Sequence, residues 1–388
     1  EFRCRFMKLN IRIMKKLVLL PFLVLISYSS VKAYQTEDLK HSLQELLDNA
    51  IEQDSTIPGI LLHVEAPDLD LFYSASSGVS DLSTRAPLPE NGTARIASNT
   101  KTYVAVSVLR LWEQGKLELD DPIIKHISDK HTQILKSDGY DLIKITVRHL
   151  LTHTSGLFDH AGSNTYIEKV FADPSYEWTR TEQVQGCVDW GDPLFEPGEQ
   201  FSYSDTGYIL LGEIIENVTE KSLGEAVREL INFKKLDLSA TWWEKIEQKP
   251  STAPDRIHQY FREIDTYSFD PSLDLYGGGG LVANAKDMAR FYQELFTGNV
   301  FEQSSTLDTM ITKVSFPEGY APSSDYRMGI FYFNFNEMDM YSHSGFWSTQ
   351  ATYIPELNAS VSIIITQFAK GRLINRLLIE TADLLNDH

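Results

Sequence analysis

Ser98-Asn99-Thr100-Lys101 opens an apolar segment, Tyr103–Trp112, that stops before Gly115. Because this segment is apolar on nearly every side, it predicts a helix that is buried over most of its surface. Ser98 then lies at the positive N-terminal end of the helix, and Lys101 lies one turn further on the same face. A serine hydroxyl becomes a nucleophile when a neighbouring amine of lowered pKa takes its proton. Taken alone, however, such a tetrad is more often a serine that caps a helix.

Two further motifs follow, the first roughly 100 residues after the tetrad and the second roughly 140 residues after the first. Tyr203-Ser204-Asp205 precedes a predicted helix, and His343-Ser344-Gly345 falls on a predicted strand. Taken singly, Tyr203 is a turn residue before a helix and His343 is a histidine on a strand surface. Together with the first tetrad, and in this order, the three motifs indicate a catalytic site.

Strand patterns lie towards the two ends of the chain, and helical patterns lie between them. Amphipathic helices are predicted over residues 37–52 and 373–385, and a mostly helical stretch from about 98 to 249. The predicted strands are residues 59–65, 71–76, 328–335, 338–343, 351–354 and 361–366. We therefore expect an α+β fold, in which an antiparallel sheet built from both termini is flanked by helices and carries an inserted, mostly helical lobe.

The first 33 residues have the pattern of an export signal. Two lysines precede an apolar run, Leu17–Ile26, and small residues precede a cleavage point after Ala33. A membrane anchor is the alternative, but the run is short for a bilayer span and contains Pro21. We expect a signal peptide over residues 1–33, of which residues 1–6 are extraneous, and an exported protein, periplasmic or extracellular.

The charge of the chain excludes two classes of partner. The net charge is −19, and removal of residues 1–33, which carry seven Lys/Arg and one Glu, leaves −25. Such a field repels nucleic acid and anionic membrane surfaces, so we expect neither as a partner and no stable membrane insertion after signal cleavage. The only other cysteine besides Cys4 is Cys187, so no internal disulfide is expected in the mature chain.

At these motifs the sequence resembles the serine β-lactamase and penicillin-binding-protein superfamily, on its class C β-lactamase and D,D-peptidase-like branch. Residues 146–157 and 279–291 contain tracts that also resemble this branch. The resemblance covers most of residues 37–385 and implies a β-lactamase/transpeptidase-like fold. We expect residues 34–388 to form a single hydrolase domain, whose sheet lobe comprises 34–97 and about 260–388 and whose helical lobe comprises about 98–259.

The resemblance also implies a serine hydrolase that works through an acyl-enzyme. Ser98 would attack the carbonyl carbon, and Lys101 and Tyr203 would share the proton; which of the two is the base stays open because coupled groups titrate as a unit. The backbone N–H groups of Ser98 and Phe346 would form the oxyanion hole. Gly345 would leave room for the acyl group to approach the strand.

Two positions depart from the pattern of the β-lactamases on this branch. Asp205 stands where they carry Asn, and an ionised Asp beside Lys101 favours the ammonium form and pushes the base role towards Tyr203. His343 stands where many carry Lys, and a neutral imidazole is a weaker anchor for a substrate carboxylate. Residues expected to contact substrate are Asp205, His343, Ser344, Gly345 and Trp347, with Trp347 in the acyl pocket.

These departures, and the acidic surface, predict a neutral or cationic acyl donor. We expect a small-molecule ester, or else an amide or peptide substrate, because esters have better leaving groups. The alternatives are a D,D-carboxypeptidase, a D-aminopeptidase or a class C-type β-lactamase. A non-catalytic relative that binds cell-wall peptide or a partner protein is the alternative of another class, because Asp205 could hold Lys101 as a permanent cation.

Other clusters in the sequence indicate no further chemistry, and we expect no cofactor and no metal. His149, His153 and His160 match no zinc motif, since no Glu follows His149 in the required position. The tract Gly277–Gly280 lacks the Lys-Ser/Thr of a phosphate-binding loop and is expected to let the backbone pass close to the site.

Overall fold

The structure is a computed structural model that describes residues 36–388. The predicted signal peptide, residues 1–33, lies outside the described residues. Within the described part of the chain, no helix has both the length and the apolar character required to cross a bilayer.

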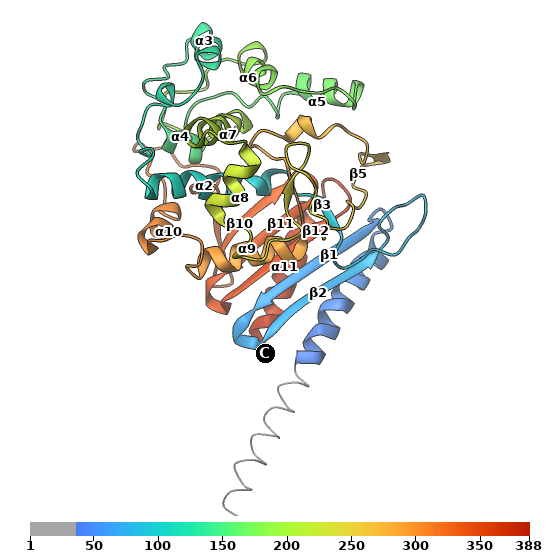
Figure 1. The fold of residues 1–388 in the computed structure, drawn as a ribbon. Helices are drawn as coiled ribbons and strands as arrows, with labels where there is room; N and C mark the ends of the chain where they lie inside the picture. Colours follow the sequence, from blue (N-terminus) through green and yellow to red (C-terminus); the bar gives the residue numbers. More distant parts are fainter. Residues whose placement is uncertain (1–35) are drawn as a thin grey trace, which may run out of the picture.

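A seven-stranded antiparallel sheet forms the centre of the fold, in the strand order β2-β1-β12-β11-β10-β9-β8 (Figure 1). The N-terminal and C-terminal strands lie side by side, since β1 pairs with β12 and Ile60 stands opposite Ile365. The α+β class and the sheet built from both ends of the chain are therefore confirmed. The strands of this sheet are β1 (Gly59–Ala66), β2 (Leu71–Gly78), β8 (Asp325–Tyr326), β9 (Phe331–Phe335), β10 (Met338–Gly345), β11 (Thr349–Ile354) and β12 (Ala359–Ile365).

Helices cover both faces of the sheet, and the alternation of side chains along β1 shows the two layers. Ile60 and Leu62 pack into a cluster with the helix over residues 36–53 and with α11 (Gly371–Asn386). Leu61, which points the other way, belongs to the larger core shared with α9 (Ala285–Phe296) and the helical lobe. All eight residues of β1 are buried, as expected of a strand covered on both faces.

A helical lobe sits above one end of the sheet (Figure 1). Its centre is α2, which is buried from Thr100 to Leu111, as the apolar sequence predicts. The helices are α2 (Thr100–Glu113), α3 (Asp129–Ser137), α4 (Val147–Leu151), α5 (Asn164–Ala172), α6 (Arg180–Asp189), α7 (Asp205–Thr219), α8 (Leu223–Ile231) and, later in the chain, α10 (Ser304–Met310). Short 3-10 turns are η1 (Pro67–Leu69), η2 (Ala97–Asn99), η3 (Ile123–Lys125), η4 (Pro271–Asp274) and η5 (Pro355–Leu357).

The structure differs from the sequence-based prediction in its short elements. The predicted strand 328–335 begins only at Phe331, because Gly329 has a φ of +79° and turns the chain between β8 and β9. The helical stretch ends at Ile231, short of the predicted residue 249. The short strands outside the seven-stranded sheet are β3 (Thr93–Arg95), β4 (Trp242–Trp243), β5 (Tyr260–Phe261), β6 (Ile264–Asp265) and β7 (Leu281–Asn284).

The end of β10 lies directly against the turn that carries Ser98. A Cβ atom on Gly345 would lie 2.2 Å from the Ile96 carbonyl oxygen and 2.4 Å from Thr349 Oγ1. The contacts give a further reason for this glycine, because it makes room for the protein's own backbone.

Replacing Gly345 by alanine should force β10 and η2 apart. Because the new methyl group meets backbone, which cannot swing away, we expect a loss of about 1–3 kcal/mol in the free energy of unfolding. Thermal and urea unfolding measure it, with Gly371→Ala as the control, since a Cβ there meets open space at the start of α11. Equal unfolding midpoints for the two variants would contradict the proposed contact.

Candidate active site

Ser98 and Lys101 lie on one side of the first turn of α2. Ser98 is in η2, immediately before the helix, and Lys101 Nζ donates a hydrogen bond to Ser98 Oγ at 3.0 Å. The same ammonium donates to the carbonyl oxygen of Gly278 at 2.6 Å and to Asp205 Oδ1. Lys101 is fully buried, so these three oxygens replace the water that its charge would otherwise require.

The backbone around Ser98 is held in an uncommon conformation. Ala97 has a φ of +45°, in the left-handed region, which costs about 1–3 kcal/mol for a residue with a side chain. Buried Asn99 stabilises the turn, since its Nδ2 donates to Ile96 O at 3.1 Å and to Thr349 Oγ1 at 2.9 Å. Asn99 thus ties the Ser98 turn to β11.

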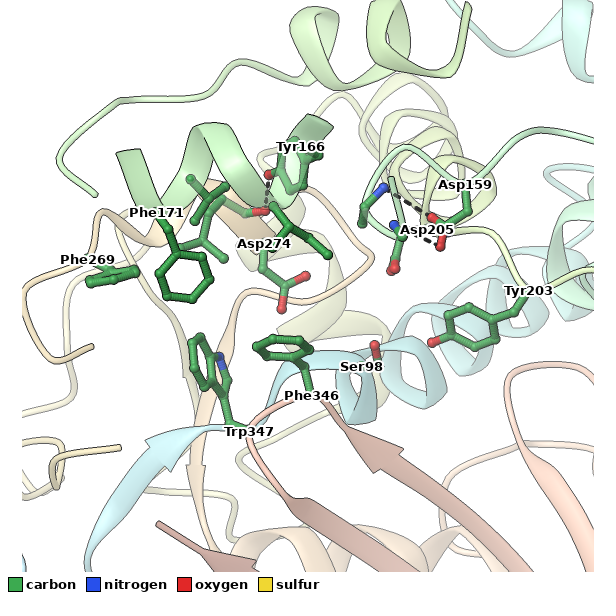
Figure 2. A pocket seen from close by; sticks show the side chains of 15 residues that line it. Ser98, Asp159, Tyr166, Phe171, Tyr203, Asp205, Phe269, Asp274, Phe346 and Trp347 are labelled. Carbon is green, nitrogen blue, oxygen red and sulfur yellow. Dashed lines mark hydrogen bonds between the residues drawn. The ribbon is translucent and has the colours of Figure 1, made fainter. Parts of the chain in front are cut away.

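Tyr203 lies at the end of the loop before α7. Its ring is 4.2 Å from the His153 ring, measured between centroids, and Lys101 Nζ is 5.0 Å from the Tyr203 centroid. Figure 2 shows the Tyr203 hydroxyl pointing towards Ser98. Removal from water raises the pKa of Tyr203, an effect that the Lys101 ammonium opposes. The structure therefore brings Ser98, Lys101 and Tyr203 into one cluster.

Asp205 is the first residue of α7 and pairs with the buried ammonium. Burial by itself lowers the pKa of Lys101, but the negative charge of Asp205, aided by Tyr203 and Asp274, outweighs it and holds that pKa above its usual value. The resting site therefore contains a lysine ammonium, in agreement with the effect expected for aspartate at this position.

A cavity of about 360 Å³ opens beside Ser98 (Figure 2). Its lining is largely apolar and aromatic, and it also carries three carboxyl groups, those of Asp159, Asp205 and Asp274. Trp347 lies in the wall, as expected for an acyl pocket, and Phe346 lies next to it. The lining residues are Ser98, Asp159, Ala161, Gly162, Tyr166, Ile167, Val170, Phe171, Tyr203, Asp205, Phe269, Leu273, Asp274, Phe346 and Trp347.

Sequence reasoning missed two of these acids, Asp159 and Asp274. Asp159 accepts the backbone N–H groups of Asp205 at 3.0 Å and of Gly162 at 3.1 Å. Burial, and then the charge of Asp205, raise the pKa of both Asp159 and Asp274 to about 7. The sequence held one signal for Asp274, namely its place three residues before the tract Gly277–Gly280.

The glycine tract is explained by these acids. A Cβ on Gly278 would lie 2.6 Å from Asp205 Oδ1, and a Cβ on Gly279 would lie 2.1 Å from Asp274 Oδ2. The tract therefore lets the backbone pass close to the site, and in doing so it makes space for two carboxylates.

His343 and Ser344 do not lie where substrate contact was expected. Neither lines the cavity: His343 is buried and its Nε2 meets the Tyr326 hydroxyl at 3.2 Å, while Ser344 borders a hollow with Ser342, on the other face of β10. Burial lowers the pKa of His343 to about 3, so its imidazole is neutral. Because side chains alternate along a strand, only positions 343 and 345 of the three-residue motif lie on the side of β10 that faces Ser98.

The three histidines that match no zinc motif in the sequence each have a hydrogen-bond partner within the protein. Nδ1 of His149 accepts the Thr146 N–H, Nδ1 of His153 accepts the Ser204 N–H, and Nδ1 of His160 meets the Thr206 hydroxyl. Among residues 36–388, no group of three His, Cys, Asp or Glu side chains is placed to hold a metal ion.

Asp205→Asn should shift the pH dependence of Ser98 reactivity. The Asp205 charge raises the pKa of both Lys101 and Tyr203, so either proton acceptor would titrate at lower pH without it. We expect the rate of labelling by a fluorophosphonate to begin its alkaline rise at lower pH in this variant. Asp383→Asn, on the exposed side of α11, is the matched control. Superimposable profiles for Asp205→Asn and the native protein would count against the ion pair.

Comparisons with known proteins agree with this fold. A family model described as beta-lactamase matches residues 47–383. Penicillin-binding protein 4* of Bacillus subtilis (strain 168) is 26% identical over 307 residues, 73% of this chain and 62% of the relative. Protein flp of Staphylococcus aureus (strain MW2) is 29% identical over 195 residues, 49% of this chain and 36% of the relative. The chain thus spans less than two thirds of the length of these relatives.

Solved structures share the fold at lower sequence identity. D-amino acid amidase from Ochrobactrum anthropi SV3, complexed with L-phenylalanine amide, has a TM-score of 0.75 at 23% identity, covering 90% of this chain and 99% of that chain. A D-stereospecific amidohydrolase from Streptomyces sp. has a TM-score of 0.69 at 24% identity, covering 84% and 94%. EstCE1, a hydrolase with promiscuous acyltransferase activity, has a TM-score of 0.68 at 20% identity, covering 90% and 99%. Since the family model matches most of its length, the chain belongs to the beta-lactamase family.

Proposed function

We propose that this protein is a serine hydrolase that forms an acyl-enzyme at Ser98 and cleaves an ester or amide with a neutral or cationic acyl donor. One observation carries the proposal: the Ser98 hydroxyl, hydrogen-bonded to the Lys101 ammonium, opens into a largely apolar cavity lined by carboxylates. Membership in the beta-lactamase family, whose members are serine hydrolases, supports the reaction class.

In the proposed reaction, Ser98 Oγ forms a bond to the carbonyl carbon and the bond to the leaving group breaks. Lys101 is held as an ammonium and cannot take the proton, so the Tyr203 hydroxyl accepts the Ser98 proton while passing its own to the leaving group. The backbone N–H groups of Ser98 and Phe346 stabilise the negative oxygen. A water molecule then attacks the acyl carbon of the ester intermediate, the bond from that carbon to Ser98 Oγ breaks to release the carboxylic acid, and Tyr203 takes a proton from the water while passing its own to Ser98 Oγ.

The charges around the cavity argue against substrates with a carboxylate next to the reacting bond. No Lys, Arg or His is among the described residues that line the cavity, and His343 behind it is neutral. The cavity instead presents Asp159, Asp205 and Asp274. A β-lactam or an acyl-D-Ala-D-Ala peptide would place its carboxylate near this negative charge. Among the alternatives, a D-aminopeptidase agrees best with these charges.

Ser98→Ala should abolish labelling by a fluorophosphonate probe, and Tyr203→Phe should slow ester hydrolysis by roughly 10²- to 10⁴-fold, the usual value of acid–base assistance. Tyr176→Phe is the matched control, because Tyr176 is exposed and outside the cavity lining. Native protein that is not labelled at all would favour the non-catalytic, ligand-binding alternative. Equal rates for the two tyrosine variants would remove Tyr203 from the proton relay.

A substrate panel should rank p-nitrophenyl butyrate above nitrocefin in kcat/KM. The butyryl ester is neutral, whereas nitrocefin brings a carboxylate into a cavity that already holds three acids. Initial rates of both, together with a D-amino-acid amide and an acyl-D-Ala-D-Ala peptide, measure the ranking. Much faster cleavage of nitrocefin would show that the protein is a β-lactamase and that the charge argument is wrong.

A further inference from the structure

Asp274 is an acid without a partner in the candidate site. It ends η4, and Figure 2 shows its carboxylate pointing into the cavity above Phe346. Among the described residues, no hydrogen bond or ion pair reaches this carboxylate. The Asp274 carboxylate is partly exposed, and its exposed surface lies in the cavity, so a ligand that fills the cavity would remove it from water and would have to supply the missing partner.

The neighbouring charges are already engaged. The Lys101 ammonium is shared between Asp205, Ser98 and Gly278 O. Arg95, the other cation whose field reaches Asp274, is paired with Glu244 at 2.7 Å. The site thus holds three carboxylates and one buried ammonium, and it can accept further positive charge.

Asp159 is a second acid that lines the same cavity. Its oxygens accept backbone N–H groups of Asp205, Ala161 and Gly162, which fix its position. Largely apolar side chains also line the cavity, and among the four named next only Trp347 has a polar atom, its indole N–H. They are Val170, Phe171, Phe269 and Trp347.

We infer that Asp274, together with Asp159, binds the ammonium group of the acyl donor, so that the substrates are aminoacyl esters and amides whose apolar side chain packs against the aromatic wall. This inference rests on the proposed function and names the substrate class of the same site. An ammonium fits better than a metal ion, because no three-ligand metal group exists among residues 36–388. It also has several N–H donors, enough to serve both carboxylates.

A matched pair of substrates isolates the ammonium. Phenylalanine benzyl ester, as both enantiomers, and 3-phenylpropionic acid benzyl ester have the same ring and leaving group and differ only in the amino group. We expect the native protein to prefer one or both aminoacyl esters. Asp274→Asn should lower the ratio of kcat/KM for the aminoacyl esters to kcat/KM for the desamino ester by about 30-fold or more, the usual effect of removing one partner of a desolvated charge pair.

The pH dependence gives a readout that a structural role would not move. Burial, and then the Asp205 charge, raise the pKa of Asp274 and Asp159 to about 7, against the opposing fields of Lys101 and, for Asp274, Arg95. Below that pH the carboxyls are protonated and bind an ammonium weakly, while the substrate amine keeps its proton. The preference for the aminoacyl ester should therefore fall as the pH is lowered from 7 to 5.5, and should change less in Asp274→Asn.

The controls separate this inference from the proposed function. Asp255→Asn, at an exposed ion pair with Lys249, should keep the native preference. Fluorophosphonate labelling of Ser98 in Asp274→Asn shows that this variant is folded. If the native protein cleaves the desamino ester as well as the aminoacyl esters, or if Asp274→Asn lowers both equally, the ammonium site is wrong and the serine hydrolase stands. If no ester is cleaved and Ser98 is not labelled, the proposed function fails, and the inference with it.

Discussion

The buried ammonium of Lys101 is the interaction on which the site depends. A lysine with no exposed surface loses several kcal/mol of hydration, and it stays charged only if its partners replace that water. Those partners come from three separate parts of the chain: Ser98 before α2, Asp205 at the start of α7, and the carbonyl group of Gly278. The cluster therefore forms only when the helical lobe and the strands around the glycine tract are assembled, which links folding to the geometry of the candidate nucleophile.

The positive charge of Lys101 also bears on the proposed reaction and on the choice of substrate. In the proposed reaction, Lys101 as an ammonium stabilises negative charge on Ser98 and leaves the movement of the proton to Tyr203. The remaining carboxylates, Asp159 and Asp274, then give the cavity an excess of negative charge next to an apolar wall. In the proposed function, acids that lie outside the three sequence motifs therefore select the substrate.

Much of this architecture could be predicted from the sequence, and the reasons are local. The apolar segment of α2 and the strands at both chain ends have strong patterns, because burial on both faces leaves few polar positions. The cluster of Ser98, Lys101 and Tyr203 followed from a resemblance that spans three motifs. Asp159 and Asp274 could not be predicted, because a single acid in a loop has no periodicity and its direction depends on tertiary packing. The burial of His343 could not be predicted for a similar reason, since its partner Tyr326 lies on a two-residue strand that has no sequence signal.

The charge state of Lys101 can be measured directly. In protein labelled with ¹⁵N-lysine, the Nζ signal of Lys101, assigned by its loss in Lys101→Arg, can be followed by NMR as the pH is raised. We predict an ammonium signal from pH 6 to pH 9, because the Asp205 charge outweighs the effect of burial. A signal that titrates below pH 8, or that is a neutral amine at pH 7, would contradict the ion pair and return the base role to Lys101.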